Sequence, residues 1–177
     1  ETLLIEGDPD LKYLQEISKR YGSKEFLILT YTPNEGMVSD TSINNLLSLK
    51  YKIQSLDWVH SVITLLDIPL LNSSDAPLQE RLENFKTLKD EEINRERGFK
   101  EIVNSPVFRN FVISEDGKTS GIIVNIKKNS ELKNIKDKSK KEIEKLKDKI
   151  KKQNHQNILE IRDVIKSYED IGKIHLG

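Results

Sequence analysis

The chain contains no cysteine, which excludes disulfide bonds, thiolate metal sites and cysteine nucleophiles. It also lacks any run of about eighteen apolar residues, so none of its segments is expected to cross a bilayer. Charge of neither sign prevails, because 29 Lys and Arg residues balance 29 Asp and Glu residues. This balance removes the global electrostatic argument for a nucleic-acid partner or an anionic membrane.

Motifs that would point to a cofactor are also missing. The sequence has no G-x-G-x-x-G or P-loop pattern, so no nucleotide site is expected. It has no G-x-S-x-G elbow, and no serine has a histidine placed beside it in sequence. The eight glycines are used for helix ends and turns instead. We expect no cofactor, no metal and no catalytic residue in this chain.

What the chain does contain suffices for one domain. It has 177 residues, of which 36% are hydrophobic and 33% are charged. Globular domains average about 25% charged residues, so the composition indicates a modest core with long solvated helices. We expect residues 1–177 to be a single piece of a longer protein, because no Met precedes Glu1 and the apolar run KIHL comes just before Gly177. Processing of a longer precursor would leave the same ends.

Residues 8–33 carry the clearest local pattern. Asp8 is a candidate helix cap and Pro9 suits the first helical position. The helix predicted over 9–21 has one apolar face, formed by Leu11, Leu14, Ile17 and Tyr21. Gly22 is expected to end this helix, and a buried strand is expected over 25–32.

A strand–helix–strand unit continues from there. Ser39 or Asp40 is expected to cap a helix that ends near Ser55. The β-branched and aromatic residues of 58–66 favour a second strand. Such a unit supports parallel pairing of its two strands through a right-handed crossover.

The middle of the chain is expected to hold an insertion and a hairpin. Residues 67–108 begin as a loop and then become highly charged, which predicts one or two short surface helices. Asp116-Gly117 lies between two β-rich runs, 111–114 and 120–126, and predicts a hairpin that adds an extra strand to the sheet.

Residues 127–153 form a lysine-rich arm, with twelve lysines against five acidic residues and no Gly or Pro. The pattern fits a long solvated helix, a two-helix hairpin, or a charge-rich linker held loosely against the domain. Asn154 or Asn157 is then expected to cap a final helix, which Gly172 ends before the last strand.

Without the insertions, the order from Phe26 is strand, helix, strand, strand, helix, strand. This order predicts an α+β fold of the split βαβ, ferredoxin-like type. We expect a sheet of four or five strands with its helices packed on one face.

Histidine and carboxylate patterns favour structure over chemistry. His60, His155 and His175 are dispersed and share no metal-ligand spacing, so structural or exposed positions are expected. The run Asp90-Glu91-Glu92 has no turn glycine at calcium-loop spacing and is interpreted as a solvated helix face. The sequence Glu115-Asp116-Gly117 is interpreted as a turn.

The lysine-rich arm and Trp58 each have a functional and a structural interpretation. The lysines of 127–153 could bind anionic lipid headgroups or an acidic partner, but the segment has no aromatic anchors, so a solvated arm is favoured. Trp58 stands at the start of an apolar strand, where core packing is the default and a place in an apolar substrate groove is the alternative.

Four segments in order resemble one known family. Residues 8–33 are similar to its opening "DPDxxYxxxxxxxYG" helix and "YTP" strand, and 58–71 resemble its "V-x-S-V-x-S-L-x-x-x-P" segment. Residues 104–124 look like its "SP…S-x-DG-k-T" hairpin, and 161–177 are similar to the segment before its "GGVP" strand. The family is the MMPL-like branch of the RND-superfamily transporters, and the matching part is the extracytoplasmic porter domain. The lysine-rich arm departs from the family pattern.

This resemblance implies a domain of a proton-driven exporter in a bacterial inner membrane, with this segment in the periplasm. It implies hydrophobic or lipid-like substrates, proton-carrying residues in membrane helices outside this chain, and no covalent chemistry here. The implied partners are a sister porter domain, the membrane helices of the same parent chain and further copies of the protein. The alternative is a free-standing soluble binding or adaptor module that uses the lysine-rich arm. A small α/β hydrolase-like enzyme is a third interpretation, which the missing nucleophile–base pair disfavours.

Overall fold

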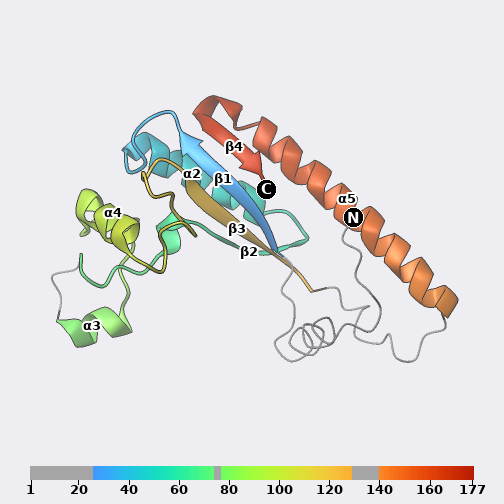
Figure 1. The fold of residues 1–177 in the computed structure, drawn as a ribbon, viewed down its shortest axis with the longest axis horizontal. Helices are drawn as coiled ribbons and strands as arrows, with labels where there is room; N and C mark the ends of the chain where they lie inside the picture. The colour runs from blue at the N-terminus through green and yellow to red at the C-terminus, as the bar shows by residue number, and fades with distance from the viewer. Residues whose placement is uncertain (1–25, 74–76, 129–139) are drawn as a thin grey trace.

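The computed structural model of the protein describes residues 26–73, 77–128 and 140–177 (Figure 1). Within these ranges the chain has an α+β fold built on a four-stranded antiparallel sheet with the strand order β2-β3-β1-β4. The strands are β1 (Phe26–Pro33), β2 (Val59–Ile63), β3 (Ser120–Ile126) and β4 (Gly172–Leu176). The helix expected over 9–21 and residues 129–139 of the lysine-rich arm lie outside the described residues.

Two helices connect the strands. Helix α2 (Asp40–Gln54) joins β1 to β2, and helix α5 (Lys140–Lys166) leads into β4. The first two strands run in the same direction but do not pair, because β3 lies between them and bonds to both in antiparallel fashion. The expected parallel pairing is therefore wrong. Antiparallel partners form straighter hydrogen bonds, and β3 provides them along both of its edges.

One face of the sheet forms the core with the two helices. Alternation along β1 and β3 turns Leu29, Tyr31, Ile122 and Val124 to this inner face, where all four are fully buried. Helix α2 lies behind the strands in Figure 1. It contributes four fully or nearly buried side chains, Ile43, Leu46, Leu49 and Ile53.

Helix α2 begins as the sequence predicts. The hydroxyl of Ser39 accepts a hydrogen bond from the backbone N–H of Ser42 at 3.1 Å, which makes Ser39 rather than Asp40 the cap. Asp40 occupies the first turn, where its negative charge interacts favourably with the positive end of the helix dipole.

Helix α5 combines two segments that the sequence analysis separates. It runs without a break from Lys140 to Lys166, so the expected cap at Asn154 or Asn157 is wrong. The side-chain amide of Gln153 donates to the side-chain oxygen of Asn157 at 2.9 Å, one turn apart, and this bond leaves the helical backbone intact. Ile161 and Val164 fix the C-terminal half to the core, while the N-terminal half extends past the sheet (Figure 1).

Two predicted strands are shorter than expected. The strand predicted over 58–66 ends at Ile63, because a capped 3-10 turn, η1 (Leu65–Asp67), follows it. The hairpin turn at Asp116-Gly117 forms, with Gly117 at φ 69°, but the extra strand over 111–114 is reduced to a bridge between Ile113 and Ser120. A helical hydrogen bond from Val112 N–H to Phe108 C=O, 2.8 Å, curls the chain and prevents a longer pairing.

The segment between β2 and β3 is largely irregular. It contains two short helices, α3 (Leu78–Glu83) and α4 (Arg95–Asn104). They project from the sheet at the end opposite the N-terminal half of α5 (Figure 1). We call residues 67–108 the insertion lobe. None of the described helices is long and apolar enough to cross a membrane.

Candidate functional site

A cleft of about 650 Å³ lies in the insertion lobe, between α4 and the loops on either side of it. Its apolar lining consists of Pro69, Leu71, Ile102, Pro106, Val107 and Phe108, and its polar and charged lining consists of Asn72, Ser73, Arg97, Lys100, Glu101, Asn104 and Ser105. Val107 and Leu71 are both exposed large apolar side chains. The volume lies in the range of small-molecule sites, about 300–1,000 Å³, and such sites combine apolar side chains with placed polar groups.

Glu101 on α4 fixes one wall of this cleft. One of its carboxylate oxygens accepts hydrogen bonds from the backbone N–H groups of Leu71, at 2.7 Å, and Asn72, at 3.0 Å. The other accepts from the Ser73 hydroxyl at 2.6 Å. Partial burial alone would raise the pKa of Glu101, but these donors together hold that pKa below its ordinary value.

Two arginines secure the same loop from its carbonyl side. Arg81 donates to the Leu71 carbonyl at 2.6 Å, and Arg97 donates to the Asn72 carbonyl at 2.7 Å. The loop is therefore held on both its N–H and its C=O groups. A wall fixed in this way is preorganised for a ligand, because little backbone freedom remains to be lost on binding.

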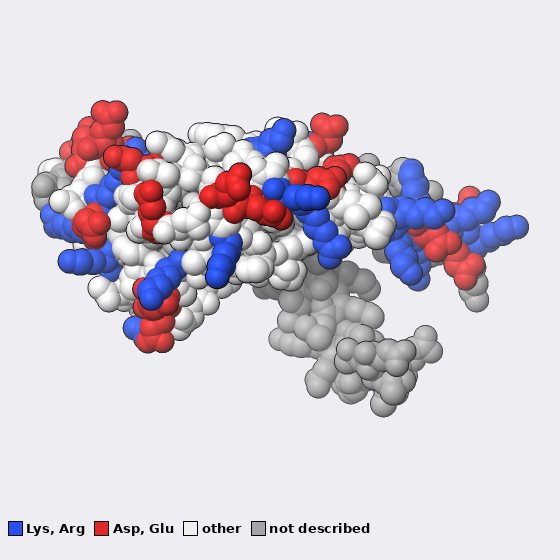
Figure 2. Space-filling model, turned by 90° about the horizontal axis from the view of Figure 1, so that it is seen from above, with Lys and Arg blue, Asp and Glu red and all other residues white. Residues whose placement is uncertain are grey.

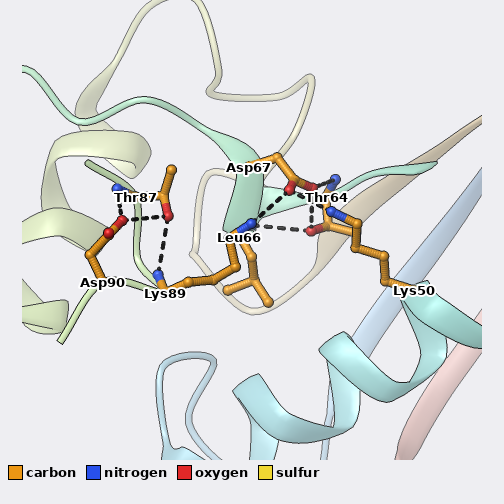
Figure 3. Close-up of polar contacts among 7 residues, drawn as sticks. All are labelled: Lys50, Thr64, Leu66, Asp67, Thr87, Lys89 and Asp90. Carbon is orange, nitrogen blue, oxygen red and sulfur yellow. Dashed lines mark hydrogen bonds and ion pairs between the residues drawn. The ribbon is translucent and has the colours of Figure 1, made fainter. Parts of the chain in front are cut away.

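Asp67 anchors the start of the insertion lobe to the sheet body (Figure 3). Its carboxylate accepts from the ammonium groups of Lys50 on α2, at 2.5 Å, and Lys89, at 3.1 Å. It also accepts from the backbone N–H of Thr64 at 2.9 Å, which completes a capping box on η1. Burial alone would raise the pKa of Asp67, but the bonds from Lys50, Thr64 and Lys89 hold it below its ordinary value.

A second Thr-x-x-Asp turn repeats this arrangement a short distance away (Figure 3). The Asp90 carboxylate accepts from the backbone N–H of Thr87 at 2.7 Å and from the Thr87 hydroxyl at 3.0 Å. Lys89, inside this turn, is the residue that reaches Asp67 in the first. The pattern T-x-x-D occurs at both places in the sequence, so a search for capping boxes would have located both turns.

The candidate metal residues of the sequence analysis do not come together. His60 on β2, His155 on α5 and His175 on β4 are all exposed and lie on separate elements. Across residues 26–73, 77–128 and 140–177, no three His, Asp or Glu side chains are placed to hold one metal ion.

The candidate carboxylates act in local structure. Asp90 caps its turn as described, and Glu92 pairs with Lys86 at 3.0 Å. Asp116 accepts from the Ser114 hydroxyl at 2.6 Å and from Lys118 N–H at 3.1 Å, and these bonds hold the pKa of Asp116 below its ordinary value. Glu115 pairs with Arg109. The interpretation of 115–117 as a turn is confirmed.

Trp58 packs at the margin of the core, immediately before β2. Its indole N–H donates to the carboxylate of Glu160 on α5 at 2.9 Å, so it connects the sheet to that helix. The lysines at the start of α5 gather at one end of the molecule, with a few acidic side chains among them (Figure 2). Neither feature lines the cleft.

The Glu101 carboxylate is placed to hold the wall of the cleft rather than to act as a general base. A general base works best with a pKa near the operating pH, whereas the donors around Glu101 lower its pKa and commit its oxygens to the loop. The sequence analysis missed Glu101 and the ion pair between Lys50 and Asp67, because the partners lie 17 to 30 residues apart along the chain.

Comparison with known proteins assigns no family: no family model, no curated protein and no solved structure matches this chain.

Proposed function

We propose that this chain is the extracytoplasmic porter domain of an MMPL-like exporter of the RND superfamily. In this role it would form part of an export pathway for hydrophobic or lipid-like substrates, without covalent chemistry of its own. The parent protein would sit in a bacterial inner membrane with this domain in the periplasm. Its membrane helices would carry the protons that drive transport.

The observation that carries the proposal is the strand order β2-β3-β1-β4, with α2 and α5 in the two crossovers. A porter subdomain of the split βαβ, ferredoxin-like type, which the order of elements in the sequence predicts, would have such a sheet, and this agreement supports the proposal. The resembling segments fall on its framework: 58–71 contain β2 and η1, and 161–177 contain the end of α5 and β4. Fold alone does not define function, so the resemblance of these segments is needed as well.

The cleft of the insertion lobe supports the same proposal. In transporters built from two repeats, the substrate path commonly lies where the repeats meet. A partly apolar cleft with a rigid wall, such as the one beside Glu101, would serve as part of such a path. The domain would then move as a rigid body against a sister porter domain, coupled to the membrane helices.

The parent gene on both sides of this segment gives the first test. We expect apolar runs of about twenty residues just upstream, and several more downstream around a second copy of this domain pattern. A reading frame that opens with a signal peptide near Glu1 and stops near Gly177 would exclude the transporter.

A free-standing adaptor module is the second candidate, and the N-terminal half of α5 favours it. The helix carries seven lysines and three acidic residues between Lys140 and Lys152. It extends past the sheet (Figure 1), and charged side chains gather at that end of the molecule (Figure 2). A cationic helix of this kind suits an acidic protein partner. Titration with a polyglutamate peptide tests it: salt-sensitive binding that is lost when Lys145, Lys149 and Lys152 become Glu would favour the adaptor.

A further inference from the structure

Helix α4 turns a polar and charged face to the cleft of the insertion lobe. Arg97, Lys100, Glu101 and Asn104 all line the cleft. Their spacing of three and four residues places them on one side of the helix. The charged groups of the cleft are therefore gathered on one wall.

The loops that flank α4 provide the apolar walls. Pro69 and Leu71 come from the loop that leads into the lobe, and Pro106, Val107 and Phe108 come from the loop after α4. Leu71 is 38% exposed and Val107 is 69% exposed. These side chains leave apolar surface that a ligand in the cleft can remove from water.

The loop after α4 is held as firmly as the loop that Glu101 fixes. The Phe108 carbonyl accepts hydrogen bonds from the N–H groups of Val112, at 2.8 Å, and Phe111, at 3.1 Å. The Ser105 carbonyl accepts from the N–H of Arg109 at 3.0 Å. The apolar walls on both sides of the cleft are therefore preorganised.

The charges of the cleft favour an anion. The oxygens of Glu101 already accept from two backbone N–H groups and a hydroxyl, so this carboxylate has little capacity left for a cationic ligand. The Lys100 side chain is exposed, and within residues 26–73, 77–128 and 140–177 its ammonium has no ion-pair or hydrogen-bond partner. Asn104, one turn further along α4, carries an amide that can donate as well.

We propose that this cleft binds an amphipathic monocarboxylate, with the carboxylate on the Lys100 ammonium and the alkyl chain against Leu71 and Val107. One ammonium group balances one negative charge, and the apolar walls match the chain. The inference rests on the proposed function for its biological role, since it names the class of substrate that the exporter domain would select.

Titration of the full chain with decanoate, below the concentration at which it forms micelles, tests the proposal. In a nitrogen–proton correlation spectrum we expect the amide signals of Leu71 and Val107 to shift and those of β3 to stay unchanged. Decyltrimethylammonium has the same chain length and the opposite charge. Its Kd should be at least about tenfold higher than that of decanoate, because it cannot form the charge-assisted hydrogen bond.

A pair of lysine variants tests the contact with the carboxylate. Lys100→Gln should raise the Kd for decanoate about tenfold. The matched control is Lys52→Gln, because Lys52 is also exposed and helical but lies on α2, away from the cleft lining. It should bind decanoate as the wild type does.

Three results would overturn the proposal. Equal affinity for the two amphiphiles would show that apolar contact alone drives binding. An unchanged Kd in Lys100→Gln would remove Lys100 from the site, and unchanged signals of Leu71 and Val107 would mean that the cleft binds no such ligand.

Failure of this inference is distinguishable from failure of the proposed function. If the parent gene encodes the flanking membrane helices and decanoate does not bind, the substrate class is wrong and the exporter remains. If decanoate binds and those helices are absent, the binding site remains and the transport role is wrong.

Discussion

The sheet body and the insertion lobe are stabilised by different means. In the sheet body, β1, β3, α2 and the end of α5 bury regularly spaced apolar side chains, such as Leu29, Ile122 and Leu46. The insertion lobe buries apolar residues too, but its loops are held by carboxylates that accept backbone N–H bonds. Asp67, Asp90 and Glu101 each do so within or at the edge of the lobe.

This difference has a consequence for pH. Burial of apolar surface does not depend on protonation, whereas a carboxylate whose folded pKa is lowered stabilises the fold only while it is ionised. The folded pKa values of Asp67 and Glu101 are both lowered. Their contributions are complete above the unfolded pKa values of about 3.9 and 4.3 and disappear as the pH falls through the folded values. Acid should therefore loosen the lobe before the body.

The largest expected effect is in the sheet body, where neighbouring isoleucines face opposite ways. Ile122→Ala should reduce the free energy of unfolding by about 2–5 kcal/mol, because it opens a cavity in the core. Ile123→Ala, on the partly exposed outer face, should reduce it by about half of that or less. Urea denaturation of both variants measures the difference. Equal losses would contradict the assignment of the two faces.

The next effect is at the junction between body and lobe. Asp67→Asn removes the negative charge that two ammonium groups share and leaves Lys50 nearly buried without its counter-charge. We expect a loss of about 1–3 kcal/mol at neutral pH. The loss should shrink as the pH falls below the unfolded pKa of about 3.9. It should disappear as the pH falls through the lowered folded pKa of Asp67, where the wild-type carboxylate also becomes protonated.

Chemical denaturation across the pH range checks both parts of that prediction, and the double variant Asp67→Asn/Lys50→Met is its control. Removing the ammonium together with its partner should restore part of the stability. A loss that stays the same at every pH would show that the charge of Asp67 is unimportant.

A smaller and local effect is expected in the lobe. Glu101→Gln should weaken the bonds to Leu71, Asn72 and Ser73 by about 1 kcal/mol in total free energy of unfolding. Hydrogen exchange of the amides of Leu71 and Asn72 should become faster while that of β3 stays unchanged. Glu96→Gln, in the exposed first turn of the same helix, is the matched control and should change neither.

The smallest effect is expected in the N-terminal half of α5. Lys147 is exposed on a part of the helix that projects from the sheet, so Lys147→Ala should change the free energy of unfolding by no more than about 0.5 kcal/mol. Ile161→Ala, on the buried half of the same helix, should reduce it by about 2–5 kcal/mol. Thermal unfolding of the pair compares them. A large loss of unfolding free energy in Lys147→Ala would mean that Lys147 makes a stabilising contact.

Most regular elements followed from local patterns. The strand predicted over 25–32 is β1, and the helix that Ser39 caps is α2, because alternation and capping chemistry are written within a few residues. The unbroken α5 was missed, since Asn154 and Asn157 resemble caps until their neighbours on the formed helix are known. The clamp at Glu101 was also missed, because no local rule connects it to a loop 28 to 30 residues earlier.

The sequence by itself determined where β1 and α2 form, that disulfides and thiolate sites are excluded, and which face of α2 is apolar. These properties depend on residue type and on spacings of two to four residues, so they can be read along the chain. Only the tertiary structure decided that β3 separates β1 from β2, that Lys50 and Lys89 share Asp67, and that a cleft lies beside α4. Those outcomes depend on which distant surfaces pack together, and the free energy of that packing is a property of the whole chain.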